Sequence, residues 1–252
     1  MRQLFSYIIV LGILICASCQ DDGISFDDEQ HNPQDTDTWF SEYDTSGSVG
    51  GHYYVDLGLS VLWSTSNIGA SNPLMSGSYF AWGETAPKDS YTWDTYTYID
   101  KQDNLLKYNY DKSASKDGIV DSLYTLLPED DAAVQNWGQG WRMPTAAEFE
   151  ELRNQCNWEW VSSVGMNYYK VTGPNGKSII FPACGCIKDR ERIMYALNGC
   201  LWTSNLSINI PQHGYELTQY ATGYWMGSAD RFYGEPIRPV IKAQDIKKPS
   251  KN

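Results

Sequence analysis

The sequence of 252 residues predicts an α+β domain that follows an exported N-terminal segment. Three observations predict this fold class. Runs of β-branched and aromatic residues bounded by glycine, typical of strands, lie near both ends of the domain, at 52–69 and 235–241. One clear helical pattern lies between them, at 145–152. The intervening stretches are rich in turn residues, so short strands and long irregular loops are expected rather than long helices.

The first 18 residues have the pattern of a secretory signal peptide. Arg2 is the only charged residue before an apolar run at 4–15, and the small residues Ala17 and Ser18 stand directly before Cys19. An apolar run of about 12 residues is shorter than the roughly 20 needed to cross a bilayer. The competing interpretation is a buried N-terminal helix that ends in two chance cysteines.

The residues before Cys19 resemble the lipobox of bacterial lipoproteins, in which the cysteine is lipidated and becomes the mature N-terminus. The acidic residues at 20–22 are similar to the export signal of surface lipoproteins in Bacteroidetes-type bacteria. This resemblance implies a lipid anchor on Cys19, a location at the outer membrane and exposure at the cell surface.

Most of the net charge of −12 belongs to the segment that follows Cys19. Residues 20–50 hold nine acidic side chains and no Lys or Arg, whereas residues 51–241 hold 21 acidic against 14 basic side chains. We therefore interpret 19–50 as a lipidated cysteine and an acidic flexible spacer, and 51–241 as the folded domain. No face-sized basic cluster is present, so nucleic acid is not an expected partner.

The helix signals lie in the middle of the domain. Thr145 and Glu148 have the spacing of a capping box, which predicts a helix that begins there. A second, shorter helix is expected at 130–137, because acidic residues follow Pro128 and favour a helix N-terminus. These acidic residues, Glu129, Asp130 and Asp131, could alternatively form a hard oxygen site for a cation.

Strand patterns dominate the second half of the domain. A hairpin is expected around Gly165, and the sequence 173–176 predicts a tight turn before a further strand. A second tight connection is expected at 221–223. The expected strands are 160–164, 168–172, 178–182, 200–204, 214–220, 224–228 and 235–241. Residues 242–252 form a polar basic tail that we expect to fray.

Four cysteines follow Cys19, and they allow three complete disulfide pairings between which the sequence does not decide. Cys184 and Cys186 stand two apart on an expected strand, so they should face opposite sides and not pair with each other. A disulfide between Cys186 and Cys200 is weakly preferred, because both lie in neighbouring aromatic-rich strands. The closely spaced Cys and His pairs typical of a zinc site are absent from the sequence, so no metal or other cofactor is expected.

Six motifs occur in an order that resembles one family, the Fibrobacter succinogenes major paralogous (FISUMP) domain. The resemblance covers 51–241 and implies a C-type-lectin-like domain with paired terminal strands, one or two helices and long irregular loops. The motifs are Tyr54-Val55-Asp56-Leu57-Gly58-Leu59, Leu62-Trp63-Ser64-Thr65, Tyr79-Phe80-Ala81-Trp82-Gly83-Glu84-Thr85, Pro128-Glu129-Asp130-Asp131-Ala132-Ala133, Trp141-Arg142-Met143-Pro144-Thr145 and Ile237-Arg238-Pro239-Val240.

This chain differs from the common wording of that family at its cysteines. Where many members have Ala-Gly-Tyr, this chain has Cys184, Gly185 and Cys186, and Cys200 stands where a tyrosine is usual. Two aromatic positions thus become cysteines together, which is a second reason for preferring the pair of Cys186 and Cys200. The activity of the family is poorly defined, so the resemblance implies a fold more than a function.

The expected function is that of a non-catalytic binding protein, an adhesin that captures an extracellular glycan or a surface protein. The stretch 205–231 is dense in Asn, Tyr, Trp and His, which supply stacking area and adaptable hydrogen bonds. In C-type-lectin-like folds, to which the family is similar, this face bears the ligand. The candidate ligand-binding residues are Asn205, Asn209, His213, Tyr215, Tyr220, Tyr224, Trp225, Asp230 and Arg231. Some of these rings could instead fill the core.

Two alternatives remain at this point. A structural role, as a pilus-tip or other subunit of a surface assembly, fits the lipid anchor and spacer equally well. An enzyme similar to the formylglycine-generating relatives would use two metal-binding cysteines, but no known catalytic motif is present. His52 and His213 are the only histidines of the domain, which leaves little material for a histidine-based triad. Calcium-dependent sugar binding is disfavoured, because Glu235-Pro236-Ile237 lacks the usual third ligand.

Overall fold

The computed structural model describes residues 43–138 and 140–246, all of which belong to one compact unit, Thr36–Asn252. The expected signal peptide, Cys19 and most of the spacer lie outside the described residues. Within the described part of the chain, no helix is long and apolar enough to cross a membrane.

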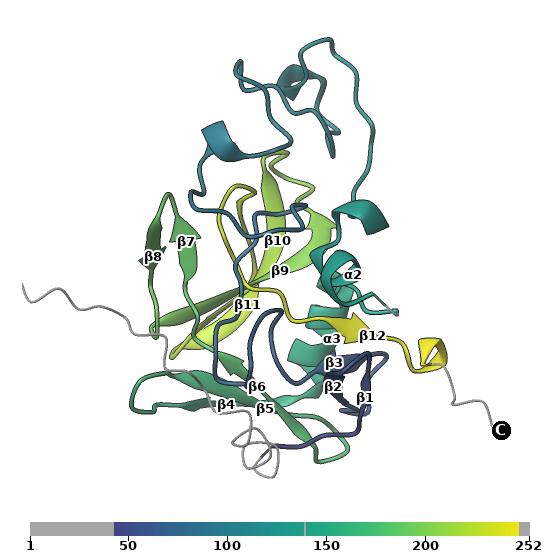
Figure 1. Ribbon diagram of the computed structural model, residues 1–252, viewed down its shortest axis with the longest axis vertical. Coiled ribbons are helices and arrows are strands. Elements are labelled where there is room, and N and C mark those ends of the chain that lie inside the picture. Colours follow the sequence, from purple (N-terminus) through teal and green to yellow (C-terminus); the bar gives the residue numbers. More distant parts are fainter. Residues whose placement is uncertain (1–42, 139, 247–252) are drawn as a thin grey trace, which may run out of the picture. The chain divides into compact units, whose positions relative to one another are not determined.

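The domain is α+β, as the sequence predicts, with two short helices and several small antiparallel sheets (Figure 1). One sheet joins the two ends of the domain in the strand order β1-β2-β3-β12. Its strands are β1 (Gly47–Val49), β2 (His52–Val55), β3 (Leu62–Ser64) and β12 (Val240–Ile241). Pairing of Trp63 with Val240, both fully buried, confirms the expected pairing of the terminal strands.

The ends of this sheet differ from the strands that the sequence predicts. β1 lies within the stretch 20–50 and pairs with β2, and the Asp44 carboxylate accepts a hydrogen bond from the backbone N–H of Ser178. β1 is an edge strand held by backbone bonds, so it needs no apolar alternation that a sequence pattern would reveal. At the other end β12 is only two residues long, because Pro236 and Pro239 have no N–H for a continuous ladder.

The longest strands form a separate sheet, in the order β11-β10-β9, which carries most of the predicted binding residues. Its members are β9 (Asn198–Leu206), β10 (His213–Tyr220) and β11 (Gly223–Asp230). A register shift between Gly214 and Glu216 interrupts the β9–β10 pairing. The indole of Trp82 lies directly over Gly214, where a Cβ would come within 2.5 Å of the ring, so a glycine is required there.

The third sheet and a short hairpin complete the strands. The sheet β4-β5-β6 comprises β4 (Asn157–Val161), β5 (Tyr168–Thr172) and β6 (Ser178–Pro182), which confirms the hairpin around Gly165 and the turn at 173–176. The hairpin of β7 (Cys186–Lys188) and β8 (Glu191–Ile193) was not expected from the sequence. Its strands have three residues each, too few for a recognisable period.

Both expected helices are present, as α2 (Ala132–Trp137) and α3 (Ala146–Gln155). The hydroxyl of Thr145 accepts from the N–H of Glu148 while the Glu148 carboxylate accepts from the N–H of Thr145, which confirms the capping box. α3 buries Phe149 and Leu152 against the β9–β10–β11 sheet (Figure 1).

The acidic cluster before α2 has a structural use. Asp131 accepts hydrogen bonds from the N–H groups of Ala133, Val134 and Met143, so it caps α2. Asp130 accepts from Tyr98 and Tyr108 and pairs with Lys107. Asp131 is therefore a helix cap, and Asp130 is already paired with two tyrosines and a lysine.

Most of the large rings lie in the interior. Trp63, Trp82, Trp141 and Trp202 are at most 1% exposed. Each indole N–H of Trp82 and Trp202 donates to a backbone carbonyl, of Thr203 and Phe80 respectively. The aromatic richness of the sequence thus serves the core to a large extent, which restricts the rings available to a ligand.

Between β3 and α2 the chain forms a long irregular region, drawn in blue to teal in Figure 1, whose only helical turns are 3-10 turns. Buried Arg231 fastens it to the strands by donating to the carbonyl oxygens of Lys107, Tyr108 and Pro211. A backbone bond from Leu126 to Ser204 adds a second attachment beside the end of β9.

Candidate functional site

The nine predicted ligand-binding residues separate into three groups. One group lies where the loop between β9 and β10 meets the long irregular region. Another lies at the turn between β10 and β11. The third is used to hold the fold together. The first group, at the loop, is Asn209, His213, Tyr215 and Asp230. The second group, at the turn, is Tyr220 and Trp225. The third group is Asn205, Tyr224 and Arg231.

The residues of the third group do not belong to an exposed face. Arg231 is fully buried, and three backbone carbonyls accept its hydrogen bonds. The amide of Asn205 accepts from the N–H of Ala146 at the start of α3 and donates to Thr125. Tyr224 stacks on Trp158 with 4.2 Å between ring centroids. A polar or aromatic residue in a loop-like stretch serves packing as readily as binding, and the sequence alone did not separate these uses.

Three residues of the first group lie within a patch that we call the loop-end patch, defined by Tyr110, Tyr124, Ile208, Asn209, Ile210, His213 and Tyr215. The fourth, Asp230, lies beside His213 of this patch. Backbone bonds from Ser207 to His213 and from His213 to Ile210 close the loop tightly. As a result the side chains of Ile208 and Ile210 point outward and are 64% and 41% exposed.

Aromatic side chains of the irregular region complete the loop-end patch. Tyr124 is 46% exposed and stacks on Tyr110, with 5.6 Å between ring centroids and 18° between planes. A backbone bond from Leu206 to Tyr124 holds this pair beside the loop. On the other side, the hydroxyl of Tyr215 accepts a long hydrogen bond, 3.5 Å, from the N–H of Ile208. Segments far apart in sequence thus form one surface of apolar and polar groups.

A histidine of this patch stands between a serine and an aspartate. His213 on β10 lies opposite Asp230 on β11, with Nε2 at 3.4 Å from a carboxylate oxygen. Its Nδ1 lies 3.1 Å from the hydroxyl of Ser228, two residues along the same face. The three residue types are those of a serine hydrolase triad, and no pattern in the sequence indicates this arrangement.

The second group forms a stacked aromatic pair. The rings of Tyr220 and Trp225 lie 5.4 Å apart at 14°, and Trp225 is 44% exposed on the edge strand β11. Along β10, Tyr220 is seven residues from His213, or roughly 23 Å at about 3.3 Å per residue, and it points to the opposite face. The pair is therefore a separate surface from the loop-end patch.

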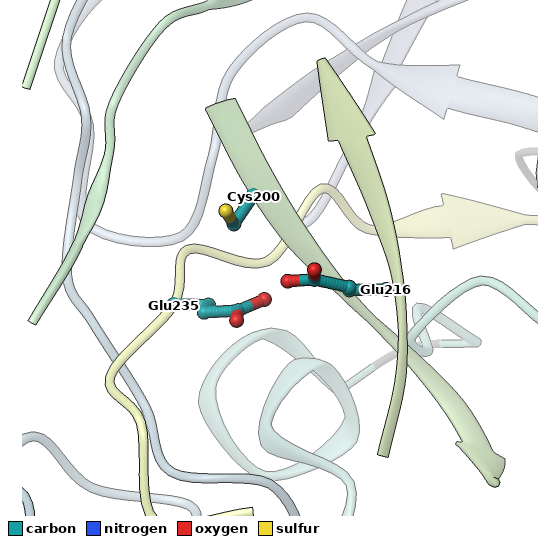
Figure 2. A group of neighbouring side chains, drawn as sticks. All are labelled: Cys200, Glu216 and Glu235. Atoms are coloured by element: carbon teal, nitrogen blue, oxygen red, sulfur yellow. The ribbon is translucent and has the colours of Figure 1, made fainter. Parts of the chain in front are cut away.

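A cysteine and two glutamates meet inside the domain, beneath the face of the β9–β10–β11 sheet that carries Trp225. Cys200 on β9, Glu216 on β10 and Glu235 after β11 present one sulfur and two carboxylate oxygens within 4.8 Å of one another. Figure 2 shows the carboxylates of Glu216 and Glu235 pointing toward each other. All three residues are at most 7% exposed. The available signals were an acidic residue inside an aromatic strand pattern and one directly before a proline.

Cys186 stands beside this group. A parallel bridge between Gly185 and Gly199 brings β7 next to β9, which places Cys186 next to Cys200. This contact and burial together raise the pKa of Cys200 well above its usual value. Cys156, Cys184, Cys186 and Cys200 are all free thiols, so the structure contains neither the preferred Cys186–Cys200 disulfide nor any other pairing of these four.

Cys184 is outside this group; it precedes β7 and is not part of a strand, in contrast to the expected strand through both cysteines. Its sulfur accepts from the amide of Asn67, and its thiol donates to the carbonyl oxygen of Pro182. Burial raises the pKa of Cys184 to about 11, which makes it a poor nucleophile at neutral pH.

Two open pockets lie elsewhere on the described surface. One is lined by Asp44, Lys170 and Ser178 among others, beside the edge of β6. The other is lined by Asp131, Arg142 and Glu148, whose charged groups already bind one another or the helix caps. Neither pocket is lined by any of the nine predicted residues.

Comparisons of the chain with protein-family models, with curated proteins and with solved structures find no match.

Proposed function

We propose that this protein is a non-catalytic, lipid-anchored protein of the outer membrane that captures an extracellular ligand through the loop-end patch. The observation that carries the proposal is the gathering of exposed aliphatic and aromatic side chains with hydrogen-bonding groups at one end of the β9–β10–β11 sheet. Ile208, Ile210 and Tyr124 are each more than 40% exposed. Exposed apolar groups rimmed by polar ones are typical of interaction sites.

The composition of the patch favours a protein ligand over a free glycan. Isoleucine offers neither a hydrogen bond nor a flat ring, so Ile208 and Ile210 gain most by contact with apolar protein surface. A glycan would be better served by the Tyr220–Trp225 pair, a flat exposed surface with polar groups at its edges. The two ligand classes thus correspond to two different surfaces of the same hairpin.

Binding is favoured over hydrolysis at His213, although its neighbours are Ser228 and Asp230. The 3.4 Å separation between Asp230 and His213 exceeds a normal hydrogen bond, and the Asp230 side chain is 35% exposed. His213, Ser228 and Asp230 lie on one face of the sheet, and none of them lines either pocket described above. A fluorophosphonate probe should therefore not label the protein; labelling that Ser228→Ala abolishes would establish a hydrolase instead.

The experiment that tests the proposal uses the full-length chain in detergent, probed against arrayed extracellular-matrix proteins, mucins and glycans. We expect saturable binding to a protein or mucin spot that Ile208→Asp weakens at least tenfold. The matched control is Leu197→Asp, because Leu197 is similarly exposed, 61% against 64%, and lies outside the patch. Glycan binding that survives Ile208→Asp and is lost in Trp225→Ala would place the ligand at the other surface.

The anchor has its own test. In cells that express the full-length chain, Cys19→Ser should release the protein from the membrane fraction and abolish incorporation of labelled fatty acid. Unchanged membrane association in this variant would contradict a lipid anchor and would favour assembly with other envelope proteins.

A further inference from the structure

The group formed by Cys186, Cys200, Glu216 and Glu235 is buried without the partners that buried carboxylates need. Both oxygens of Glu235 and one oxygen of Glu216 have no hydrogen-bond partner, although Glu235 is fully buried and Glu216 is 7% exposed. The other oxygen of Glu216 accepts from the hydroxyl of Thr218. A buried carboxylate without a donor or a cation is strongly unfavourable.

Two arrangements would relieve this cost. One is a proton shared between the carboxyl groups, since burial and the neighbouring Glu216 raise the pKa of Glu235 well above its usual value. A shared proton satisfies one oxygen on each side and leaves the second oxygen of Glu235 without a partner. The other arrangement is a cation, which satisfies several oxygens at once and also engages the sulfur that lies within 4.8 Å of them.

The chemistry of the ligand atoms selects the class of cation. Thiolates favour zinc over calcium or magnesium, and zinc also accepts carboxylate oxygens. A tetrahedral zinc ion with bonds of about 2.0–2.3 Å separates its ligand atoms by roughly 3.3–3.8 Å. The Cys200, Glu216 and Glu235 atoms, all within 4.8 Å, need only small side-chain rotations to reach this spacing.

We propose that this protein binds one zinc-type divalent cation through Cys200, Glu216 and Glu235, with Cys186 as the fourth ligand. A site whose ligands are all buried and all supplied by the protein is structural in character, because no position remains for a substrate. It would join the paired strands β9 and β10 to β7 and to the segment after β11, which the structure connects to its surroundings through isolated bridges such as Gly185–Gly199 and Ile187–Gly234.

The proposed site excludes a disulfide between Cys186 and Cys200, because the metal ligand is the thiolate. It also goes beyond the proposed surface function, since none of its four residues belongs to the loop-end patch. The metal would enter during folding, because the finished site is closed to solvent.

The test is to refold the full-length chain with zinc, remove unbound metal and measure the metal content by mass spectrometry. We expect one zinc per chain, and cobalt in its place should show a thiolate charge-transfer band. Glu235→Gln, of nearly the same shape, and Cys200→Ser should each lower the zinc affinity at least tenfold. Cys184→Ser is the matched control, because Cys184 is buried but outside the group, and it should keep the metal.

Three results would overturn the proposal. The first is refolded protein of native circular dichroism that contains no zinc. The second is bound cobalt without a thiolate band. The third is a Cys186–Cys200 disulfide, detected by peptide mass spectrometry, that forms under mild oxidation at the same rate with and without zinc. The first result would leave the shared proton as the state of this group, the second would show that the cation does not bind Cys200, and the third would show a disulfide in place of the site.

Discussion

At the scale of single residues, two buried arginines hold the fold together through backbone carbonyls. Arg238 is fully buried, and its guanidinium donates to the carbonyl oxygens of Ser64, Thr65 and Ile180 and to the amide oxygen of Asn67. Burial lowers the pKa of Arg238 to about 9. The planar fork of five N–H donors suits several acceptors at once, which a lysine ammonium cannot match in geometry.

Replacing Arg238 should therefore be costly. Arg238→Ala removes the guanidinium bonds to four buried acceptors, and each acceptor left without a donor costs roughly 1–3 kcal/mol. We expect the free energy of unfolding to fall by at least about 3 kcal/mol in urea titrations, with Arg238→Lys nearly as harmful. The exposed Arg190→Ala is the control and should stay within about 0.5 kcal/mol of the wild type. A small loss in Arg238→Ala would show that water replaces the guanidinium.

Residue identity predicted exposure poorly for the arginines and aromatic rings. Arg231 stands in a polar, tyrosine-rich stretch that looks like a binding loop, yet it is fully buried. Trp225 comes from the same stretch and is exposed. The difference depends on which face of β10 and β11 meets the rest of the domain, and this long-range contact leaves no mark in the local pattern.

At the scale of elements, the start of α3 combines three interactions on one carboxylate. Glu148 accepts from the N–H of its cap residue Thr145 and forms a two-bond pair with the guanidinium of Arg142. Burial alone would raise the pKa of Glu148, but the bonds from Arg142 and Thr145 outweigh it, so the pKa is lowered. The ionised carboxylate is thus the form that stabilises the fold.

The lowered pKa of Glu148 in the folded state predicts how stability responds to acid. Because the folded pKa of Glu148 lies below the unfolded value of 4.5, its contribution is complete above pH 4.5 and is lost as the pH falls through the folded value. We expect the free energy of unfolding to decline less between pH 5 and pH 3 in Glu148→Gln than in the wild type. At pH 7 the variant should be about 1.5–3 kcal/mol less stable. Parallel pH curves would contradict this assignment.

Elements with a capping motif, a turn signal or a strand pattern of about five residues were predictable, whereas the shortest strands were not. The cap at Thr145, the strand 178–182 and the turn at 221–223 agree with the structure. β1 and the β7–β8 hairpin escaped prediction because strands of three residues pair through their backbone.

At the scale of the whole molecule, the last strand closes the domain onto its first sheet. β12 pairs with β3, and Val240 and Ile241 are fully buried. A chain that ends at Arg238 loses this strand and the burial of two aliphatic side chains, at roughly 1.5–3 kcal/mol each, so we expect it to unfold by circular dichroism at 25 °C. A chain that ends at Ile246 keeps every contact described here and should melt like the full-length protein.

The candidate site was predictable in part, by its stretch of sequence but not by its shape. The segment 205–231 does supply exposed groups, including Asn209 and Trp225. The tyrosines that complete the loop-end patch, Tyr110 and Tyr124, come from the irregular region about 90 residues earlier. The group of Cys186, Cys200, Glu216 and Glu235 also comes from separate strands and a loop. Because both groups depend on long-range contacts, local sequence patterns do not predict either of them.

Amide hydrogen exchange of the full-length chain, with and without the ligand identified on the array, locates the binding surface. We expect slower exchange at 207–215 and 122–125 in the complex and no change at 220–225. Protection confined to the turn at 220–225 would contradict this expectation, because the ligand would then lie on the Tyr220–Trp225 surface and not on the loop-end patch.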